Sequence, residues 1–103
     1  MPKDVKAAFG AALYMAQTGT EAAHVKALKG FGGRGVLEVI EDHDGDTYRA
    51  VYTVKFATVV YVLHAFQKKS RSGIATPKRD LDLIASRLKD AETLHHHLAS
   101  KEK

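Results

Sequence analysis

Residues 47–66 have the sequence TYRAVYTVKFATVVYVLHAF, and this stretch decides the fold that the chain is expected to adopt. From Thr47 to Phe56 the side chains alternate with the period of two that is typical of a β-strand. One face of this strand carries Tyr48, Ala50, Tyr52, Val54 and Phe56. From Thr58 to Phe66 the residues are apolar on both faces, which is typical of a strand at the centre of a covered sheet. We therefore expect two neighbouring strands.

A third strand is expected just before this stretch, from Val36 to Glu41. Residues 42–46 contain an Asp-Gly pair between two strand-like segments, which is a strong signal for a hairpin turn. Ahead of them, residues 30–35 hold four glycines and predict a flexible turn. The three strands are consecutive, so we expect an antiparallel sheet.

Helices are expected on both sides of the sheet. Residues 3–17 carry apolar side chains at helical spacing, and Gly19 supplies a stop signal. A second, shorter helix is expected from Glu21 to Leu28, with Thr20 as its N-cap, so that the chain would begin with a helical hairpin. These two helices would precede the sheet.

The last helix is expected to open at Thr76 or Pro77, because a capping residue followed by proline suits a first turn. From about residue 93 the chain is expected to be loose, or helical without a partner. The apolar stripe of this helix comprises Leu81, Ile84, Leu88, Ala91 and Leu94.

Residues 1–103 are thus expected to form one α+β domain, with an N-terminal helical hairpin, a three-stranded antiparallel sheet and a C-terminal helix. The chain has no cysteine, which fits a reducing compartment. It has neither a signal-peptide pattern nor an apolar run near the roughly 20 residues of a membrane span. We expect a cytoplasmic protein without a membrane partner.

The charge balance favours an acidic partner. Sixteen Lys and Arg residues against twelve Asp and Glu give a formal net charge of +4, which suits a nucleic acid or an acidic protein. The basic cluster in residues 68–79 fits a phosphate-binding surface, and it fits a solvated, lysine-rich loop equally well. Residues 68–79 have no acid and carry Lys68, Lys69, Arg71, Lys78 and Arg79.

Three motifs suggest a ligand, and their context argues against each. The glycines of residues 30–35 match a dinucleotide fingerprint but lead into a strand, so the helix that would receive the pyrophosphate is missing. The aspartates of residues 42–46 begin like a calcium loop, yet its twelfth position is Thr53 instead of a glutamate. Residues 95–97 are three histidines that point about 100° apart on a helix. We expect neither a metal nor a cofactor.

The remaining constellation suits metal-free RNA cleavage. Arg49 on the second strand can converge with the start of the basic segment, and Lys26 and Lys29 precede the sheet. Clustered cations would hold an RNA backbone and offset charge that builds on a scissile phosphate. The general base would be Lys68 or Lys69 with a lowered pKa, or His64.

Two of these residues have structural alternatives. A lone histidine in an apolar strand, such as His64, is more often a packed core residue than a catalyst. Arg49 could equally be an exposed strand residue that pairs with Glu38 or Glu41. From the sequence both readings of each residue stay open.

At this point the chain resembles a known family. The segments 26–31, 48–52, 60–70 and 76–88 together are similar to the HigB-like, phage-derived branch of the RelE/ParE toxins. The most specific part is Phe66-Gln67-Lys68-Lys69-Ser70 with the downstream Thr76-Pro77. The resemblance covers about residues 2–91.

The resemblance implies an activity and partners. It implies ribosome-dependent cleavage of messenger RNA and a helix-turn-helix antitoxin that silences the toxin, the two proteins together binding operator DNA. Arg49 matches an arginine that assists catalysis in RelE, and Lys68 and Lys69 stand where a second arginine follows the next strand. Lys26 and Lys29 are the nearest counterparts of lysines that precede the sheet.

The chain also departs from its relatives. RelE carries a catalytic tyrosine after the basic segment, and no tyrosine follows Tyr61 here. Relatives usually have a strand before the first helix, and this chain begins at the helix. Other readings therefore stay open: a ParE-like gyrase poison, a non-catalytic nucleic-acid-binding module, or an inactive remnant that still binds its antitoxin.

Overall fold

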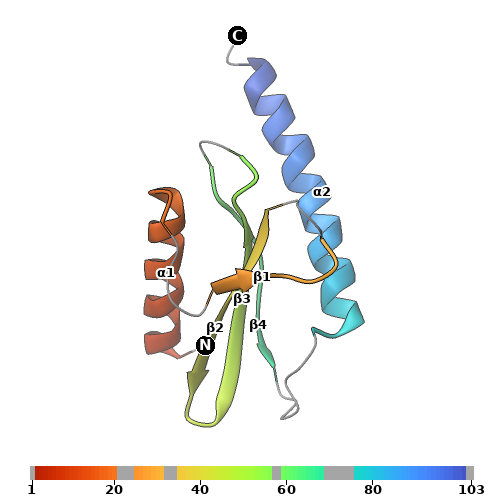
Figure 1. The fold of residues 1–103 in the computed structure, drawn as a ribbon. Coiled ribbons are helices and arrows are strands. Elements are labelled where there is room, and N and C mark those ends of the chain that lie inside the picture. Colours follow the sequence, from red (N-terminus) through yellow and green to blue (C-terminus); the bar gives the residue numbers. More distant parts are fainter. Residues whose placement is uncertain (1, 21–24, 32–34, 57–58, 69–75, 102–103) are drawn as a thin grey trace.

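A computed structural model of the chain describes residues 2–20, 25–31, 35–56, 59–68 and 76–101. Within these ranges two helices lie on opposite faces of a four-stranded antiparallel sheet of order β1-β2-β3-β4 (Figure 1). The elements in chain order are α1 (Lys3–Gln17), β1 (Val25–Ala27), β2 (Val36–His43), β3 (Asp46–Thr53), β4 (Tyr61–Lys68) and α2 (Lys78–Lys101).

Helix α1 confirms the helix expected over residues 3–17. Its buried side chains, Val5, Phe9 and Ala12, recur at helical spacing and face the sheet. The helix ends where Thr18 and Thr20 donate hydroxyl hydrogen bonds of 2.8 and 2.9 Å to the carbonyl oxygen of Met15. The same carbonyl also accepts the backbone amides of Thr18 and Thr20, at 3.1 and 2.9 Å, so the last turn is closed by several bonds.

The expected second helix is wrong. Val25–Ala27 forms strand β1, which pairs antiparallel with β2 and brings Val25 opposite Val39. Residues 21–24, the first part of the expected helix, lie outside the described residues. A three-residue strand has almost no periodicity of its own, so its partner on β2 decides its conformation. The sheet therefore has a fourth strand that the sequence pattern did not indicate.

The hairpin between β2 and β3 confirms the expected Asp-Gly turn. Asp44 and Gly45 have φ angles of 50° and 84°, the left-handed pair that a type I′ turn requires. Next to the turn, the Thr47 hydroxyl donates a 2.9 Å hydrogen bond to the Asp42 carboxylate. This turn fixes the register of β2 against β3.

Strand β4 does not lie at the centre of the sheet, as its apolar faces had suggested, but at an edge. Helix α2 packs on β4, while α1 packs on β2. Leu63 is buried, whereas Val62 is 52% exposed. An apolar run therefore indicates a strand here but not its place in the sheet, because the position depends on which strand each helix covers.

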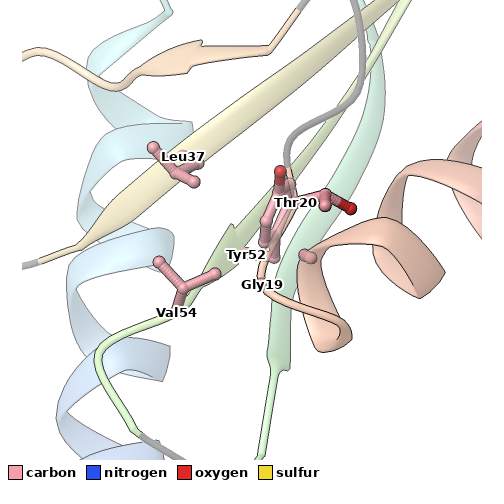
Figure 2. Close-up of a pocket in the computed structure, with 6 residues that line it drawn as sticks. Gly19, Thr20, Leu37, Tyr52 and Val54 are labelled. Carbon is pink, nitrogen blue, oxygen red and sulfur yellow. The ribbon is translucent and has the colours of Figure 1, made fainter.

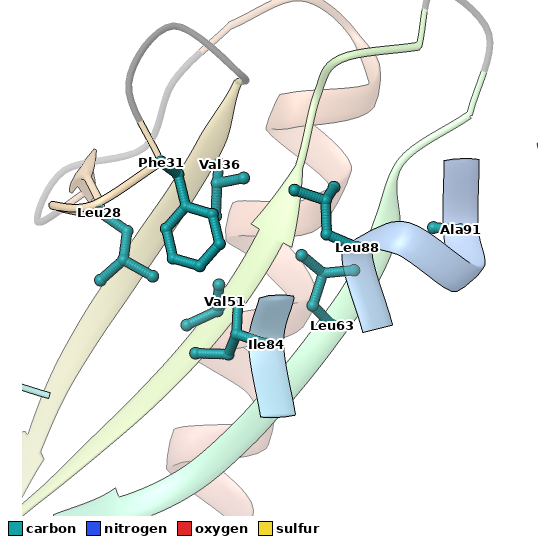
Figure 3. Close-up of a cluster of buried hydrophobic side chains, with 8 residues drawn as sticks. All are labelled: Leu28, Phe31, Val36, Val51, Leu63, Ile84, Leu88 and Ala91. Atoms are coloured by element: carbon teal, nitrogen blue, oxygen red, sulfur yellow. The ribbon is translucent and has the colours of Figure 1, made fainter. Parts of the chain in front are cut away.

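Each face of the sheet has its own core. On the α1 face, Val39, Tyr48, Ala50 and Tyr52 pack against the helix. On the other face, Ile84 and Leu88 of α2 face Val51 and Leu63 of the sheet (Figure 3). This second cluster comprises Leu28, Phe31, Val36, Val51, Leu63, Ile84, Leu88 and Ala91.

Helix α2 confirms most of its expected stripe, but not all of it. Ile84, Leu88 and Ala91 are buried and Leu81 packs against them, whereas Leu94 is 48% exposed. The tail beyond residue 93 continues the helix to Lys101, and its last turns extend past the end of the sheet (Figure 1). The stripe therefore stops at Ala91 because the sheet ends there.

We expect Leu88→Ala to lower the free energy of unfolding by about 2–5 kcal/mol, because it opens a cavity in a fully buried site. Leu94→Ala is the matched control on the same helix and should change it by less than about 1 kcal/mol. Urea unfolding followed by circular dichroism measures both. Equal losses in the two variants would contradict the placement of α2.

Candidate functional site

The side chain of Arg49 is buried in an ion pair beneath the α2 face of the sheet. Its Nη1 donates a 3.0 Å hydrogen bond to the Glu38 carboxylate, and the two residues are 4% and 2% exposed. The second carboxylate oxygen of Glu38 lies 3.8 Å from the ammonium of Lys26 on β1. Glu38 is thus the partner that the sequence allowed for Arg49, but the pair is buried and not exposed.

A cavity of about 390 Å³ opens above this pair. Lys26 and Lys29 supply exposed cations beside it, and the Arg49–Glu38 pair supplies buried charge. Strands β1, β2 and β3 and the start of α2 all contribute to its wall. The lining residues are Lys26, Ala27, Leu28, Lys29, Glu38, Arg49, Thr76 and Leu81.

Thr76 lines this cavity from the residues just before α2. It is 8% exposed, and its hydroxyl has no hydrogen-bond partner among the described residues. The sequence indicated Thr76 only as a helix-opening residue and Glu38 only as a possible partner of Arg49. Both escaped notice as site residues because burial of a polar side chain depends on tertiary packing. The one sequence signal that could have marked them as candidate site residues is a hydroxyl or carboxylate on the inner face of an element.

His64 lies on the same face of the sheet as Arg49. The register places His64 opposite Val51 and the adjacent Phe66 opposite Arg49, and the imidazole stacks on the Phe66 ring at 4.8 Å between centroids. Its Nε2 lies 3.0 Å from the Asp80 carboxylate on α2. The His64 side chain is therefore only 14% exposed, and it contacts the Asp80 carboxylate of α2 as well as an aromatic ring.

The other imidazole nitrogen of His64 is engaged as well. Nη1 of Arg87 lies 3.3 Å from Nδ1 and donates a 2.9 Å hydrogen bond to the carbonyl of Leu63. A guanidinium can only donate, so Nδ1 must present its lone pair and Nε2 must carry the proton that Asp80 accepts. The Asp80 carboxylate thus holds the imidazole ring in one orientation. In the structure the guanidinium of Arg87 occupies the space next to Nδ1.

The remaining predicted cations are brought together only in part. Lys78 and Arg79 are exposed in the first turn of α2, next to Thr76. Lys68 is the last residue of β4, opposite Thr47 in the register. Lys69 and Arg71 lie outside the described residues.

A second hollow, of about 250 Å³, lies at the C-terminal end of α1 and is lined by none of the predicted site residues. Figure 2 shows Leu37, Tyr52 and Val54 from the sheet side and Gly19 and Thr20 from the turn after the helix. This lining has no charged side chain. The hollow therefore offers no cation for a phosphate.

In the part of the chain that the structure describes, no three His, Asp or Glu side chains come close enough to hold a metal ion. His95 instead stacks on Phe56 with ring centroids 4.1 Å apart, and its Nδ1 lies 3.4 Å from the Tyr61 hydroxyl. Neither of the two described helices combines the length and apolar character needed to cross a membrane.

The family of the chain follows from a comparison with known proteins. A model of the phage-derived Gp49-like proteins (DUF891) matches residues 1–89, so the chain belongs to this family. The family is related to the RelE and HigB toxins, which confirms the resemblance at the level of the family. No curated protein and no solved structure matches the chain significantly.

We expect Glu38→Ala to lower the free energy of unfolding by about 3–5 kcal/mol, because it leaves the Arg49 charge buried without its carboxylate. The double variant Glu38→Leu with Arg49→Met should recover most of this loss, since it removes both charges and keeps the volume. Lys26→Ala, which removes an exposed cation, is the control with little effect. Urea unfolding separates the three, and a stable Glu38→Ala protein would contradict the buried pair.

Proposed function

We propose that this chain is the toxin of a type II toxin–antitoxin pair and cleaves messenger RNA on the ribosome. The cation-lined cavity on the α2 face of the sheet carries the proposal, because it joins Lys26, Lys29 and Arg49 at one place. Membership in the Gp49-like family supports it. A helix-turn-helix antitoxin would silence the toxin, and operator DNA would be bound only through that antitoxin.

The proposed chemistry needs no metal. The 2′-hydroxyl oxygen of the RNA attacks the adjacent phosphorus, a base takes its proton, and the bond to the 5′-oxygen breaks as that oxygen gains a proton. Lys26 and Lys29 would hold the phosphate oxygens. Arg49 lines the cavity from below, where its ion pair with Glu38 holds the guanidinium in place.

His64 is the base that the geometry favours among the described residues. Asp80 orients its ring in the way that a carboxylate orients a catalytic imidazole. RNA phosphate would compete for the guanidinium of Arg87, which is exposed, and so release the lone pair on Nδ1. Lys68 and Lys69 remain the alternative base, as the sequence suggested.

A nucleic-acid-binding module without catalysis is the second candidate. The observation that favours it is the contact of Arg87 with His64, which occupies the lone pair that a base needs. The absence of a tyrosine after Tyr61 points the same way. Such a module would bind RNA with a steep salt dependence and leave it intact.

The first test is induction of the chain in a bacterial host, with 5′ ends mapped across the transcriptome. We expect growth arrest with new cuts inside translated messages. Lys26→Ala with Lys29→Ala should remove both, because the phosphate loses its contacts at the cavity. Lys3→Ala with Lys6→Ala is the matched control: it removes two exposed lysines from α1, on the opposite face of the sheet.

The outcomes separate the candidates. Arrest without cuts would indicate a gyrase poison, and the absence of both arrest and cuts would favour the binding module or an inactive remnant.

RNA affinity measured against salt concentration adds a second readout. The double cavity variant should flatten the logarithmic slope by about 1.4, at about 0.7 for each phosphate contact with a single strand. An unchanged slope would remove Lys26 and Lys29 from the interface.

The base is tested by His64→Gln in purified toxin with programmed ribosomes. If His64 takes the proton, cleavage should fall by about 10²–10⁴-fold while RNA affinity stays within about twofold. Asp80→Asn should lower cleavage less, because the imidazole stays but loses its orienting carboxylate. Full cleavage by His64→Gln, with none by Lys68→Ala and Lys69→Ala, would assign the base to a lysine.

A further inference from the structure

The beginning of α2 lies at the wall of the cavity, to which Thr76 and Leu81 contribute. The amide of Leu81 donates the first helical hydrogen bond, of 3.0 Å, to the carbonyl of Pro77. The amides of residues 78–80 come before this bond and have no helical acceptor. Such amides, together with the positive end of the helix dipole, favour an anion. Helix α2 has 24 residues, which is long enough for a full helix dipole with its positive end at Lys78.

The hydroxyl of Thr76 is an independent sign of a ligand. Thr76 lies two residues before the helix, is 8% exposed and contributes to the cavity wall. Its hydroxyl oxygen is buried and has no hydrogen-bond partner among the described residues. A buried hydroxyl left in this state is unfavourable, and most such groups in proteins are paired. A hydroxyl in a cavity wall is satisfied when the cavity is filled by a group that accepts its proton.

The charges around Thr76 select an anion. Lys26 and Lys29 line the same cavity, and Lys78 and Arg79 follow Thr76 in the chain as exposed cations. The Glu38 carboxylate is already paired with Arg49, and that of Asp80 contacts His64. An acceptor that enters beside the Thr76 hydroxyl therefore meets an excess of positive charge.

We propose that this cavity binds the phosphate group of a single nucleotide, with the Thr76 hydroxyl donating to a phosphate oxygen. The cavity of about 390 Å³ is larger than a phosphate needs. Its apolar wall, formed by Ala27, Leu28 and Leu81, suits the attached nucleoside. The inference deepens the proposed function, and rests on it only for the statement that the nucleotide belongs to RNA.

The test is a titration of the isotope-labelled full chain with adenosine 5′-monophosphate, inorganic phosphate and adenosine, followed by NMR. We expect both phosphates to shift the amide signals of Thr76 and of residues 78–80, and adenosine alone to leave them in place. Thr76→Val should weaken binding of the nucleotide by about tenfold or more, as expected for a hydrogen bond to a charged group. Thr76→Ser, which keeps the hydroxyl, should bind like the parent.

A matched threonine controls for structure. The buried hydroxyl of Thr53 donates a 3.0 Å hydrogen bond to the carbonyl of Gly35 and accepts one of 3.2 Å from the Lys55 amide. Thr53→Val should therefore lower the melting temperature and leave nucleotide affinity unchanged. Thr76→Val should keep or raise the melting temperature, because it removes a hydroxyl that is unpaired in the free protein.

Three results would overturn the proposal. They are equal affinity of parent and Thr76→Val, binding of adenosine as tight as that of its monophosphate, and a loss of stability in Thr76→Val that matches the loss in Thr53→Val. Nucleotide binding that depends on Thr76 in a protein that cuts no RNA would support the phosphate site and contradict the endonuclease. RNA cleavage that is unchanged in Thr76→Val, in a protein that binds no nucleotide, would support the endonuclease and contradict the phosphate site.

Discussion

The buried pair of Arg49 and Glu38 is the interaction on which the rest of the site depends. Two charges removed from water are tolerated only when their geometry is good, because desolvation costs several kcal/mol for each ion. The two residues sit on neighbouring strands, so their 3.0 Å contact requires the register that the turn at Asp44 and Gly45 sets. A slip of one residue would turn Arg49 to the α1 face, away from Glu38.

This pair also sets the electrostatics of the cavity. Arg49 gives one positive charge and Glu38 one negative charge, so the floor of the cavity is close to neutral. The ammonium of Lys26, 3.8 Å from the carboxylate, makes the net charge positive. The cations that can meet a ligand directly are therefore the exposed ones. The pairing with Glu38 thus offsets the charge of the arginine that the sequence marked as a candidate site residue.

Local sequence patterns predicted those elements that carry their own signals. Helix α1 has an apolar stripe and a stop at Gly19, and the Asp-Gly turn has no common alternative. Strand β1 was missed because three residues hold no periodicity, and the edge position of β4 was missed because it depends on which strands the helices cover. Of the cations that the sequence predicted for the site, Arg49, Lys26 and Lys29 line the cavity.

Thr76 and the burial of Glu38 could not be predicted, since both depend on contacts between segments far apart in the chain. The same dependence explains why the cavity forms where it does. Strand β1 brings Lys26 to the edge of β2, and the packing of Ile84 and Leu88 brings the start of α2 to the other side. Neither segment holds a ligand alone. The core beneath these two segments therefore holds the polar residues of the cavity wall in place. The cavity exists only when the sheet and helix α2 are packed together.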